Sequence, residues 1–96
     1  MFVKLHRDEQ AVILAACDED LVGQTFRDGD RKLDVNEIFY RGEALDRNGL
    51  VQRMKSVDIM NLVGDETVTV AIEEGYASEE DVIVIAGVKH VQVVLL

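Results

Sequence analysis

The chain has no proline and no tryptophan, a single cysteine, and few aromatic side chains. Without proline, glycine and Asx residues must make the turns. One cysteine, Cys17, cannot form an internal disulfide, so the fold must depend on a hydrophobic core. The amino-terminal segment lacks the apolar stretch of a secretory signal, and the longest apolar run, Val82 to Val88, is far shorter than the roughly 20 residues that span a bilayer. We therefore expect a cytoplasmic protein without membrane contact.

Basic residues are also scarce. The chain has 10 Lys and Arg but 19 Asp and Glu, which gives a net charge of -9. This balance opposes binding of a phosphate backbone, so nucleic acid is disfavoured as a direct ligand. Residues 57–88 hold eight of the acids and no Lys or Arg. Such a stretch is either a solvated surface, as charge runs usually are, or an acidic face for a basic protein partner such as a translation factor or ribosomal protein.

The length predicts one domain, residues 1–96, because half of this chain would be too short to build a stable core. The chain is 48% hydrophobic and 30% charged, which is typical of a globular protein and excludes a disordered acidic tail. One core of this size leaves little room for a deep enclosed cavity. Any site is therefore expected to be shallow or shared between subunits.

Apolar segments separated by turn residues predict an α+β fold, with a mixed sheet of about five to six strands and two main helices. The expected strands are residues 2–5, 11–16, 24–27, 32–35, 57–63, 82–86 and 91–96. The first four should form two hairpins, since the turn Asp28-Gly29-Asp30 is typical of a hairpin connection. Residues 38–42 hold most of the aromatic mass and are expected to anchor the core.

The helices are predicted where apolar residues recur at helical spacing. The first covers residues 46–56 and the second follows Gly64, with Asp65 as its cap and Gly75 at its end. Because the second helix lies between two predicted strands, it indicates a strand-helix-strand unit with a right-handed crossover between parallel strands.

The last predicted strand, residues 91–96, ends on three apolar residues and must be covered. We expect it in the interior of the sheet, with pairing to a second copy as the alternative. The protein is therefore expected to be a monomer or a homodimer formed through this strand.

Four short motifs mark the joints between these elements. They are Ala16-Cys17-Asp18 with Leu21 and Gly23, Phe39-Tyr40-Arg41-Gly42, Asn61-Leu62-Val63-Gly64, and Gly87-Val88-Lys89-His90 with Gln92. Together, and in this order, they resemble a small archaeal family known as domain of unknown function 424, over essentially the whole chain. The resemblance implies a small cytosolic archaeal α+β protein with no established activity and an association with translation genes.

Cys17, Asp18, Asn61 and His90 are the chemically interesting residues, because all four are expected at strand ends or loops, where a sheet can bring side chains together. A thiol beside an imidazole predicts a small enzyme with Cys17 as nucleophile and His90 as base. The alternative is structural, with Cys17 as a small buried hydrophobe, Asp18 as the cap of a short helical turn and His90 as a turn residue. The sequence has no paired Cys or His ligands at the short spacing that a structural zinc site usually shows. No metal and no cofactor is therefore predicted.

A second group of residues is expected to line a shallow groove for a binding partner. These candidates are Asp18, Tyr40, Arg41, Asn61, Gly64 and Gln92. The loop before the second helix does not suit phosphate, since the acids at its start would repel an anion. Tyr40 and Arg41 either stack on bases or pack into the core.

Three function classes follow from these residues. The first is a small binding or adaptor module that meets a protein partner and is linked to translation. The second is the Cys17 enzyme. The third is a weak RNA-binding module, because Arg27, Arg31, Lys32 and Arg41 can form a modest basic patch.

Overall fold

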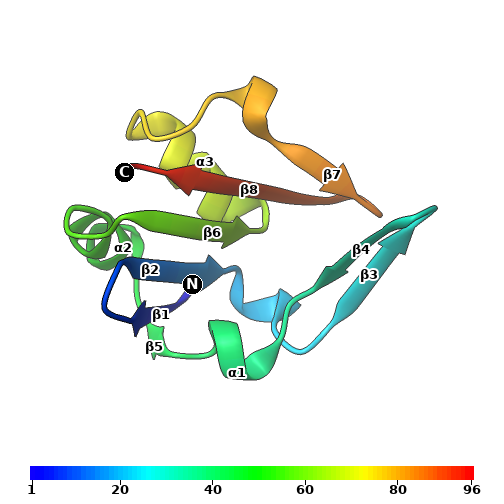
Figure 1. Cartoon of the computed structure of the whole chain (residues 1–96). Helices are drawn as coiled ribbons and strands as arrows, with labels where there is room; N and C mark the ends of the chain where they lie inside the picture. The colour runs from blue at the N-terminus through cyan, green and yellow to red at the C-terminus, as the bar shows by residue number, and fades with distance from the viewer.

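A computed structural model describes all 96 residues and shows a six-stranded mixed sheet, three helices and a small separate hairpin (Figure 1). The six-stranded sheet consists of β1 (Phe2–Arg7), β2 (Val12–Cys17), β5 (Glu43–Ala44), β6 (Ile59–Val63), β7 (Ile83–Ile85) and β8 (Val88–Val94). The remaining elements are α1 (Glu37–Tyr40), α2 (Arg47–Met54), α3 (Asp65–Glu73), the hairpin strands β3 (Thr25–Asp28) and β4 (Arg31–Asp34), and the 3-10 turns η1 (Glu19–Leu21) and η2 (Glu79–Asp81). This confirms the predicted α+β class.

The strand order is β5-β1-β2-β6-β8-β7, and β2 and β6 are the adjacent parallel pair. The other neighbours in this sheet are antiparallel. Both predicted hairpins are present, and Asp8 closes the first one by accepting hydrogen bonds from the backbone N–H groups of Gln10 and Ala11. Ala86 and Gly87, both with positive φ, form the tight turn between β7 and β8.

The predicted strand-helix-strand unit is present but differs in one respect. β6 and β7 run in the same direction, since both are antiparallel to β8, yet β8 lies between them. The C-terminal strand therefore starts in the interior of the sheet, but residues 91–94 pair with β6 alone and the last three residues are exposed, so the expected interior position is met only in part. It begins at Val88 rather than residue 91, because the turn at Ala86 and Gly87 is short enough to start pairing at once.

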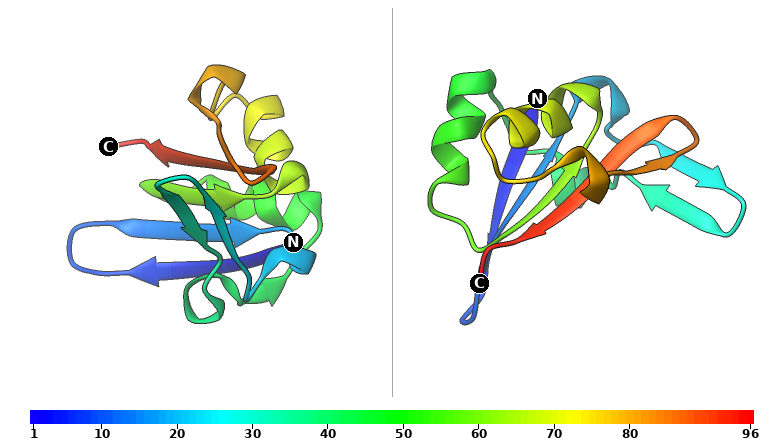
Figure 2. Two further views of the ribbon diagram at one scale, coloured as in Figure 1. Left: turned by 90° about the vertical axis from the view of Figure 1, so that its right-hand side faces the viewer. Right: turned by 90° about the horizontal axis from the view of Figure 1, so that it is seen from above.

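Alternation of side chains along the strands gives the sheet two different faces. The first, which we call the helix face, packs against α2 and α3 through a cluster that includes Leu14, Met60 and Val91. The second packs against α1 and the β3–β4 hairpin through a smaller cluster that includes Val35, Tyr40 and Val63. α1 and the β3–β4 hairpin lie over only part of this face (Figure 2).

The aromatic segment 38–42 was expected to anchor the core, and it does so only in part. Most of its aromatic mass lies in α1, which Asn36 caps by accepting a hydrogen bond from the backbone N–H of Phe39. Tyr40 is buried, whereas Ile38 is 80% exposed. No helix of the structure is long and apolar enough to cross a membrane.

Candidate functional site

The part of the second face that lies over β6 and β8 is not covered, and we call it the open face. At the β1 side, α1 is held to the sheet by Lys4 Nζ, which donates to the Ile38 carbonyl at 2.7 Å, and by stacking of His6 on Phe39. The β3–β4 hairpin covers the other end, near Ile85 and Val63. Between these two contacts the sheet presents its own side chains.

Asn61 and Gln92 lie opposite each other at the centre of the open face. Their positions form a non-hydrogen-bonded pair, since Leu95 N donates to the Asp58 carbonyl and Gly64 N to the Lys89 carbonyl, and bonded pairs alternate with non-bonded pairs along the ladder. Their Cβ atoms are therefore about 4.5–5.5 Å apart. Neither side chain makes a hydrogen bond within the chain, and Gln92 is exposed. Two amide groups are therefore available to a partner.

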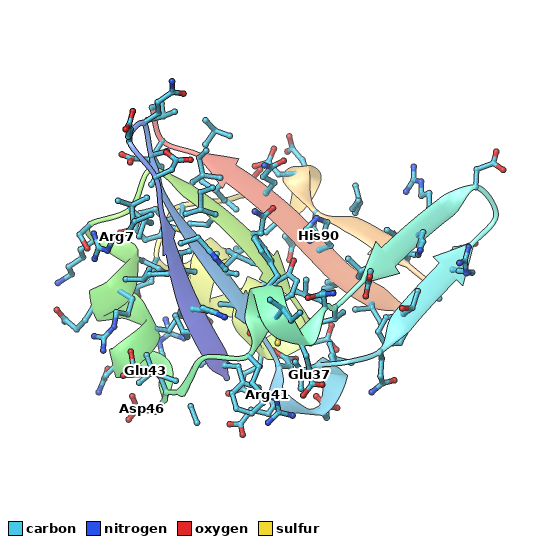
Figure 3. The ribbon with its side chains drawn as sticks, turned by 60° about the horizontal axis from the view of Figure 1, so that its bottom comes forward. Arg7, Glu37, Arg41, Glu43, Asp46 and His90 are labelled. Carbon is cyan, nitrogen blue, oxygen red and sulfur yellow. The ribbon has the colours of Figure 1, made fainter.

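His90 extends this polar centre along β8. Its Nδ1 lies 3.0 Å from the Leu62 carbonyl oxygen, which can only accept, so the neutral ring carries its proton on Nδ1. Nε2 is then left with a free lone pair and has no partner within the chain. Figure 3 shows His90 on β8, well apart from Glu37 and Arg41.

Apolar side chains border the polar centre on both sides. Ile13, Ile59 and Val94 form one row across β2, β6 and β8, because they occupy matching positions in the register. Ile83 lies opposite His90 at the other side and is 41% exposed. The open face thus has a polar centre and an apolar border.

Cys17 is fully buried in the smaller cluster, among residues that include Tyr40 and Val63. Burial, and secondarily the negative charge of Asp18, raises the pKa of its thiol to about 11. An activated nucleophile needs the opposite shift. Cys17 and His90 share a face, but Val63 of β6 lies between them, which separates their Cα atoms by about 10 Å. This geometry contradicts the hypothesis of a Cys17 nucleophile with His90 as its base.

Asp18 and Gly64 hold α3 in place. Asp18 Oδ1 accepts from Thr67 N at 2.9 Å and from Thr67 Oγ1 at 2.8 Å, and its Oδ2 accepts from Glu66 N at 3.1 Å. Gly64 has φ 105°, and a Cβ there would lie 2.3 Å from Asp18 Cγ. The prediction that Asp65 caps α3 was wrong, because the Asp18 carboxylate at the end of the neighbouring strand β2 accepts from the first turn of α3. Asp18 is the N-cap residue of η1, as expected, but its side chain makes no capping bond there.

Tyr40 and Arg41 do not reach the open face. Tyr40 is 5% exposed, and burial raises the pKa of its hydroxyl to about 12. The Arg41 guanidinium lies 4.9 Å from the centre of the Phe2 ring, and its Nε pairs with Glu37 at 2.7 Å. Of the two alternatives for Tyr40, the core position is the one observed. Asn61 and His90 lie within strands rather than at the expected strand ends.

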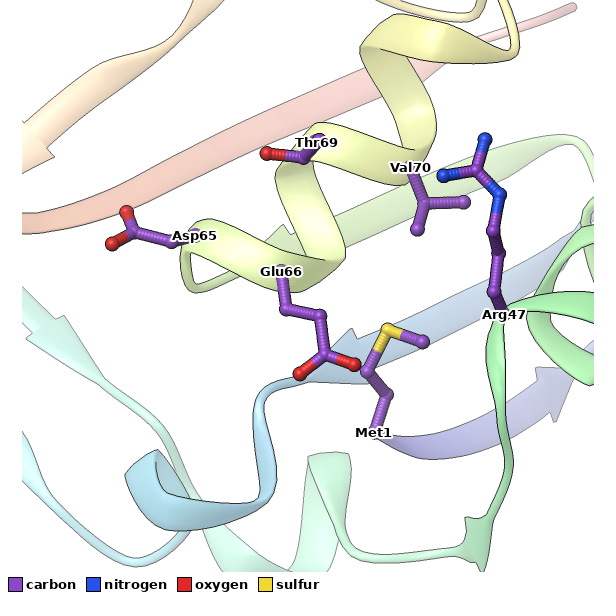
Figure 4. A pocket seen from close by; sticks show the side chains of 6 residues that line it. All are labelled: Met1, Arg47, Asp65, Glu66, Thr69 and Val70. Atoms are coloured by element: carbon purple, nitrogen blue, oxygen red, sulfur yellow. The ribbon is translucent and has the colours of Figure 1, made fainter.

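The largest pocket lies elsewhere, beside α3 on the helix face, with a volume of about 490 Å³ (Figure 4). It is lined by Met1, Arg47, Asp65, Glu66, Thr69 and Val70. Arg47 is already engaged by Glu73 and Glu74, which leaves acids as the remaining charges there. No group of three or more His, Cys, Asp or Glu side chains is placed to hold a metal ion.

Several acids of residues 57–88 have local structural roles. The Asp58 carboxylate accepts from the backbone N–H of Val12 at 2.8 Å, and Asp81 accepts from both N and Oγ of Ser78. The remaining acids of the stretch, including Glu79 and Glu80, are exposed. The stretch thus combines a few local caps with exposed carboxylates.

The fold and the open face together define a small α+β domain with one partly uncovered sheet face. The chain belongs to the DUF424 family, described as a protein of unknown function, which matches residues 6–96. It is also similar to a solved structure, the crystal structure of an uncharacterized conserved protein from Methanopyrus kandleri, at 29% identity and a TM-score of 0.79. That likeness covers 99% of this chain and 90% of the other. No curated protein matches the chain.

Proposed function

We propose that this protein is a small binding module without catalytic activity, which holds a protein partner on its open face. The observation that carries this proposal is the free hydrogen-bonding capacity of Asn61, Gln92 and His90 Nε2 at the centre of an apolar border. Polar groups with no internal partner, presented by two adjacent rigid strands, are suited to directional contacts across an interface.

The shape of the surface favours a protein over a small molecule. Ligand pockets for small molecules are concave and enclose most of the ligand, whereas none of the three pockets is lined by Asn61, His90 or Gln92. The two smaller pockets, of about 120 and 260 Å³, lie at other places in the fold. A surface patch with polar and apolar groups is typical of a protein interface.

The charge of the molecule favours a basic partner, such as a translation factor or ribosomal protein. A net charge of -9 attracts basic surfaces over the range of the Debye length, about 10 Å at 0.1 M salt, and speeds their encounter with the open face. Specific contacts with Asn61 and Gln92 would then select among basic partners.

Affinity capture of the tagged protein from a lysate of its source organism tests this proposal. The capture is repeated over a salt ladder, with and without RNase, and with a double variant, Asn61→Ala with Gln92→Ala. The control is Thr69→Ala, an exposed position on α3 at the opposite side. We expect one RNase-resistant protein partner that the double variant loses by about tenfold or more, whereas the control keeps it.

Equal capture by the double variant and the control would overturn the role of the open face. A partner that RNase removes would favour a second candidate function, the binding of RNA by the β3–β4 hairpin. One observation favours that candidate: Arg27 and Lys32 face each other across the two strands, and neither has an ion-pair partner. In that case binding falls steeply with salt, and Arg27→Ala with Lys32→Ala abolishes it.

A further inference from the structure

Exposed apolar side chains gather along one edge of the six-stranded sheet. The structure has six exposed large hydrophobic side chains, and five of them lie on β7 or at the end of β8. These five are Ile83 and Val84 on β7, and Val94, Leu95 and Leu96 at the end of β8. Concentration of exposed apolar residues on one sheet edge is uncommon, because such an edge invites pairing with another chain.

The backbone of β8 is unpaired along the same edge. β7 pairs with β8 only from Val88 to His90, so residues 91–94 have a neighbour, β6, on one side alone. We call this segment the β8 edge. Leu95 N donates to the Asp58 carbonyl at 2.7 Å, and Gly64 N donates to the Lys89 carbonyl at 2.8 Å. Because bonded positions alternate along an antiparallel ladder, the odd-numbered residues of β8 form the backbone hydrogen bonds to β6. The N–H and C=O groups of Gln92 and Val94 therefore point outward from the sheet.

A specific interaction ends β7 early and leaves this edge open. Continuing β7 backwards would bring residue 81 opposite Gln92. Instead, Asp81 Oδ2 accepts from Ser78 N at 3.0 Å and from Ser78 Oγ at 3.1 Å, which holds η2 as a helical turn. The chain therefore leaves the sheet at Val82, before it can cover Gln92 and Val94.

No strand pairs with the outer side of the β8 edge. The segment between α3 and η2 lies above the second half of β8 in Figure 1, and its Tyr76 and Ala77 pack against the helix-face cluster, so it borders this edge without pairing with it. The pocket next to β7, of about 260 Å³, is lined by Ile72, Glu79, Val82, Val84 and Lys89. It offers an apolar wall and one carboxylate to side chains that enter from this edge.

The charges around the edge select its occupant. Glu79, Glu80 and Asp81 lie directly before β7, and Lys89 is the one base that lines the neighbouring pocket. A second copy of the chain would bring the same acids and a second net charge of -9 to the interface, which disfavours a symmetric pairing of two β8 strands. An extended basic segment of another protein has the complementary charge, and long basic side chains can pack their stems on Val82 and Val84.

We infer that the β8 edge takes up an extended, basic peptide segment of a partner protein as an added strand. This inference rests on the proposed function and specifies how the partner is held. Backbone hydrogen bonds to Gln92 and Val94 supply affinity, and alternate side chains of the added strand lie on the open face near Gln92 and on the helix face near Val84. Glu79 and Glu80 select lysine or arginine in the segment.

The test is a selection of peptides from a display library of random twelve-residue sequences on the immobilised wild-type protein. We expect enriched peptides with alternating apolar and basic residues. A selected peptide should slow hydrogen exchange at the amides of Gln92 and Val94, whereas those of Val91 and Val93, which already bond to β6, should change little. Val94→Pro removes an outward N–H without touching the bonds to β6 and should weaken binding by about fivefold or more, as the loss of one hydrogen bond of about 1 kcal/mol predicts.

Two controls make the outcome specific. Val94→Ala keeps the N–H and should bind better than Val94→Pro. Glu80→Lys should weaken binding, whereas Asp30→Lys, with the same change in net charge at the tip of the β3–β4 hairpin, should not.

No enrichment of peptides, or unchanged peptide binding by the Val94→Pro variant, would overturn the inference. If Asn61→Ala with Gln92→Ala loses the captured partner while Val94→Pro retains it, the binding function stands and strand addition fails. Dimerisation of the wild-type protein that Val94→Pro abolishes would assign the edge to a second copy instead.

Discussion

At the scale of single residues, polar side chains divide into those that build the fold and those left free. Asp18 belongs to the first group, since its carboxylate satisfies three donors at the start of α3. Asn61 and Gln92 belong to the second group, because they face each other in the strand register but neither side chain makes a hydrogen bond within the chain. This division separates the binding candidates from structural residues, although both groups lie in the motifs that carry the family resemblance.

Asp18→Asn should destabilise the protein by about 2 kcal/mol, because the neutral amide loses the favourable interaction with the N-terminus of α3 and one of its acceptors. Urea unfolding measures the change. Asp20→Asn is the matched control, since Asp20 is exposed, lies nearby and makes no side-chain hydrogen bond. Equal stability of the two variants would show that the carboxylate of Asp18 does not cap α3 in solution.

Cys17 should react slowly with iodoacetamide in the folded protein. Because the thiol is buried and its pKa is raised to about 11, we expect alkylation at pH 7.5 to be on the order of 100-fold slower than for the unfolded chain. His90→Ala should leave this rate unchanged, since Val63 lies between the two residues. Rapid alkylation that depends on His90 would revive the enzyme hypothesis.

Alkaline pH should weaken the fold through Cys17 and Tyr40. Burial raises the pKa of the thiol to about 11 and that of the hydroxyl to about 12, whereas in the unfolded chain both ionise at their lower, ordinary values. The unfolded state therefore binds fewer protons above about pH 9, and the free energy of unfolding falls as pH rises toward 11, by on the order of 4 kcal/mol. Urea titrations at pH 8 and pH 11 measure the fall, and Cys17→Ala should reduce it.

At the scale of elements, the β3–β4 hairpin and the β7–β8 hairpin differ in how they meet the sheet. β7 extends the sheet beyond β8 for three residues, whereas β3 and β4 form a separate ribbon that covers part of the second face. Asp28 links the two hairpins by accepting from the backbone N–H of Ala86 at 3.3 Å. The open face exists because the ribbon and α1 cover the two ends of the sheet and leave its centre free.

The opposed cations of the β3–β4 hairpin should cost stability. Lys32→Glu places opposite charges at a directly facing pair with Arg27, and we expect it to stabilise the protein by about 0.5 kcal/mol. Lys55→Glu makes the same change in net charge at an exposed position without an ion pair, and it should be neutral or slightly unfavourable at the C-terminal end of α2. Thermal unfolding compares the two, and a destabilised Lys32→Glu would contradict the expected repulsion.

At the scale of the whole molecule, the excess of acids dominates. Exposed acids repel one another at low ionic strength, and the four surface contacts between Arg and Glu contribute little against a net charge of -9. The melting temperature should therefore rise as salt screens this repulsion, by about 4–8 °C for each kcal/mol gained. Calorimetry between 0.05 and 1 M KCl tests this, and a flat or falling melting temperature would mean that the ion pairs outweigh the repulsion.

The fold was predictable where local patterns and turns agree. Glycine and Asx residues marked both early hairpins, and helical spacing marked α2 and α3 within a few residues of their observed ends. The short β5 strand and η2 were missed, because two or three residues carry no periodicity. The cap of α3 was assigned to Asp65 because a reading of the sequence considers only adjacent residues. The carboxylate that accepts from the backbone N–H of Glu66 belongs to Asp18, which lies 48 positions earlier in the chain.

The sequence by itself determined the single α+β domain and the family, since these depend on local hydrophobic patterns and on motifs spread along the whole chain. Only the tertiary structure decided which polar residues are free, because that depends on the register of β2, β6 and β8. The register buries Cys17 beneath the hairpin and α1, places Val63 between it and His90, and sets Asn61 opposite Gln92 on an uncovered surface. A shift of one residue in β6 would move Asn61 to the helix face, so the open face is a property of strand pairing that no local motif encodes.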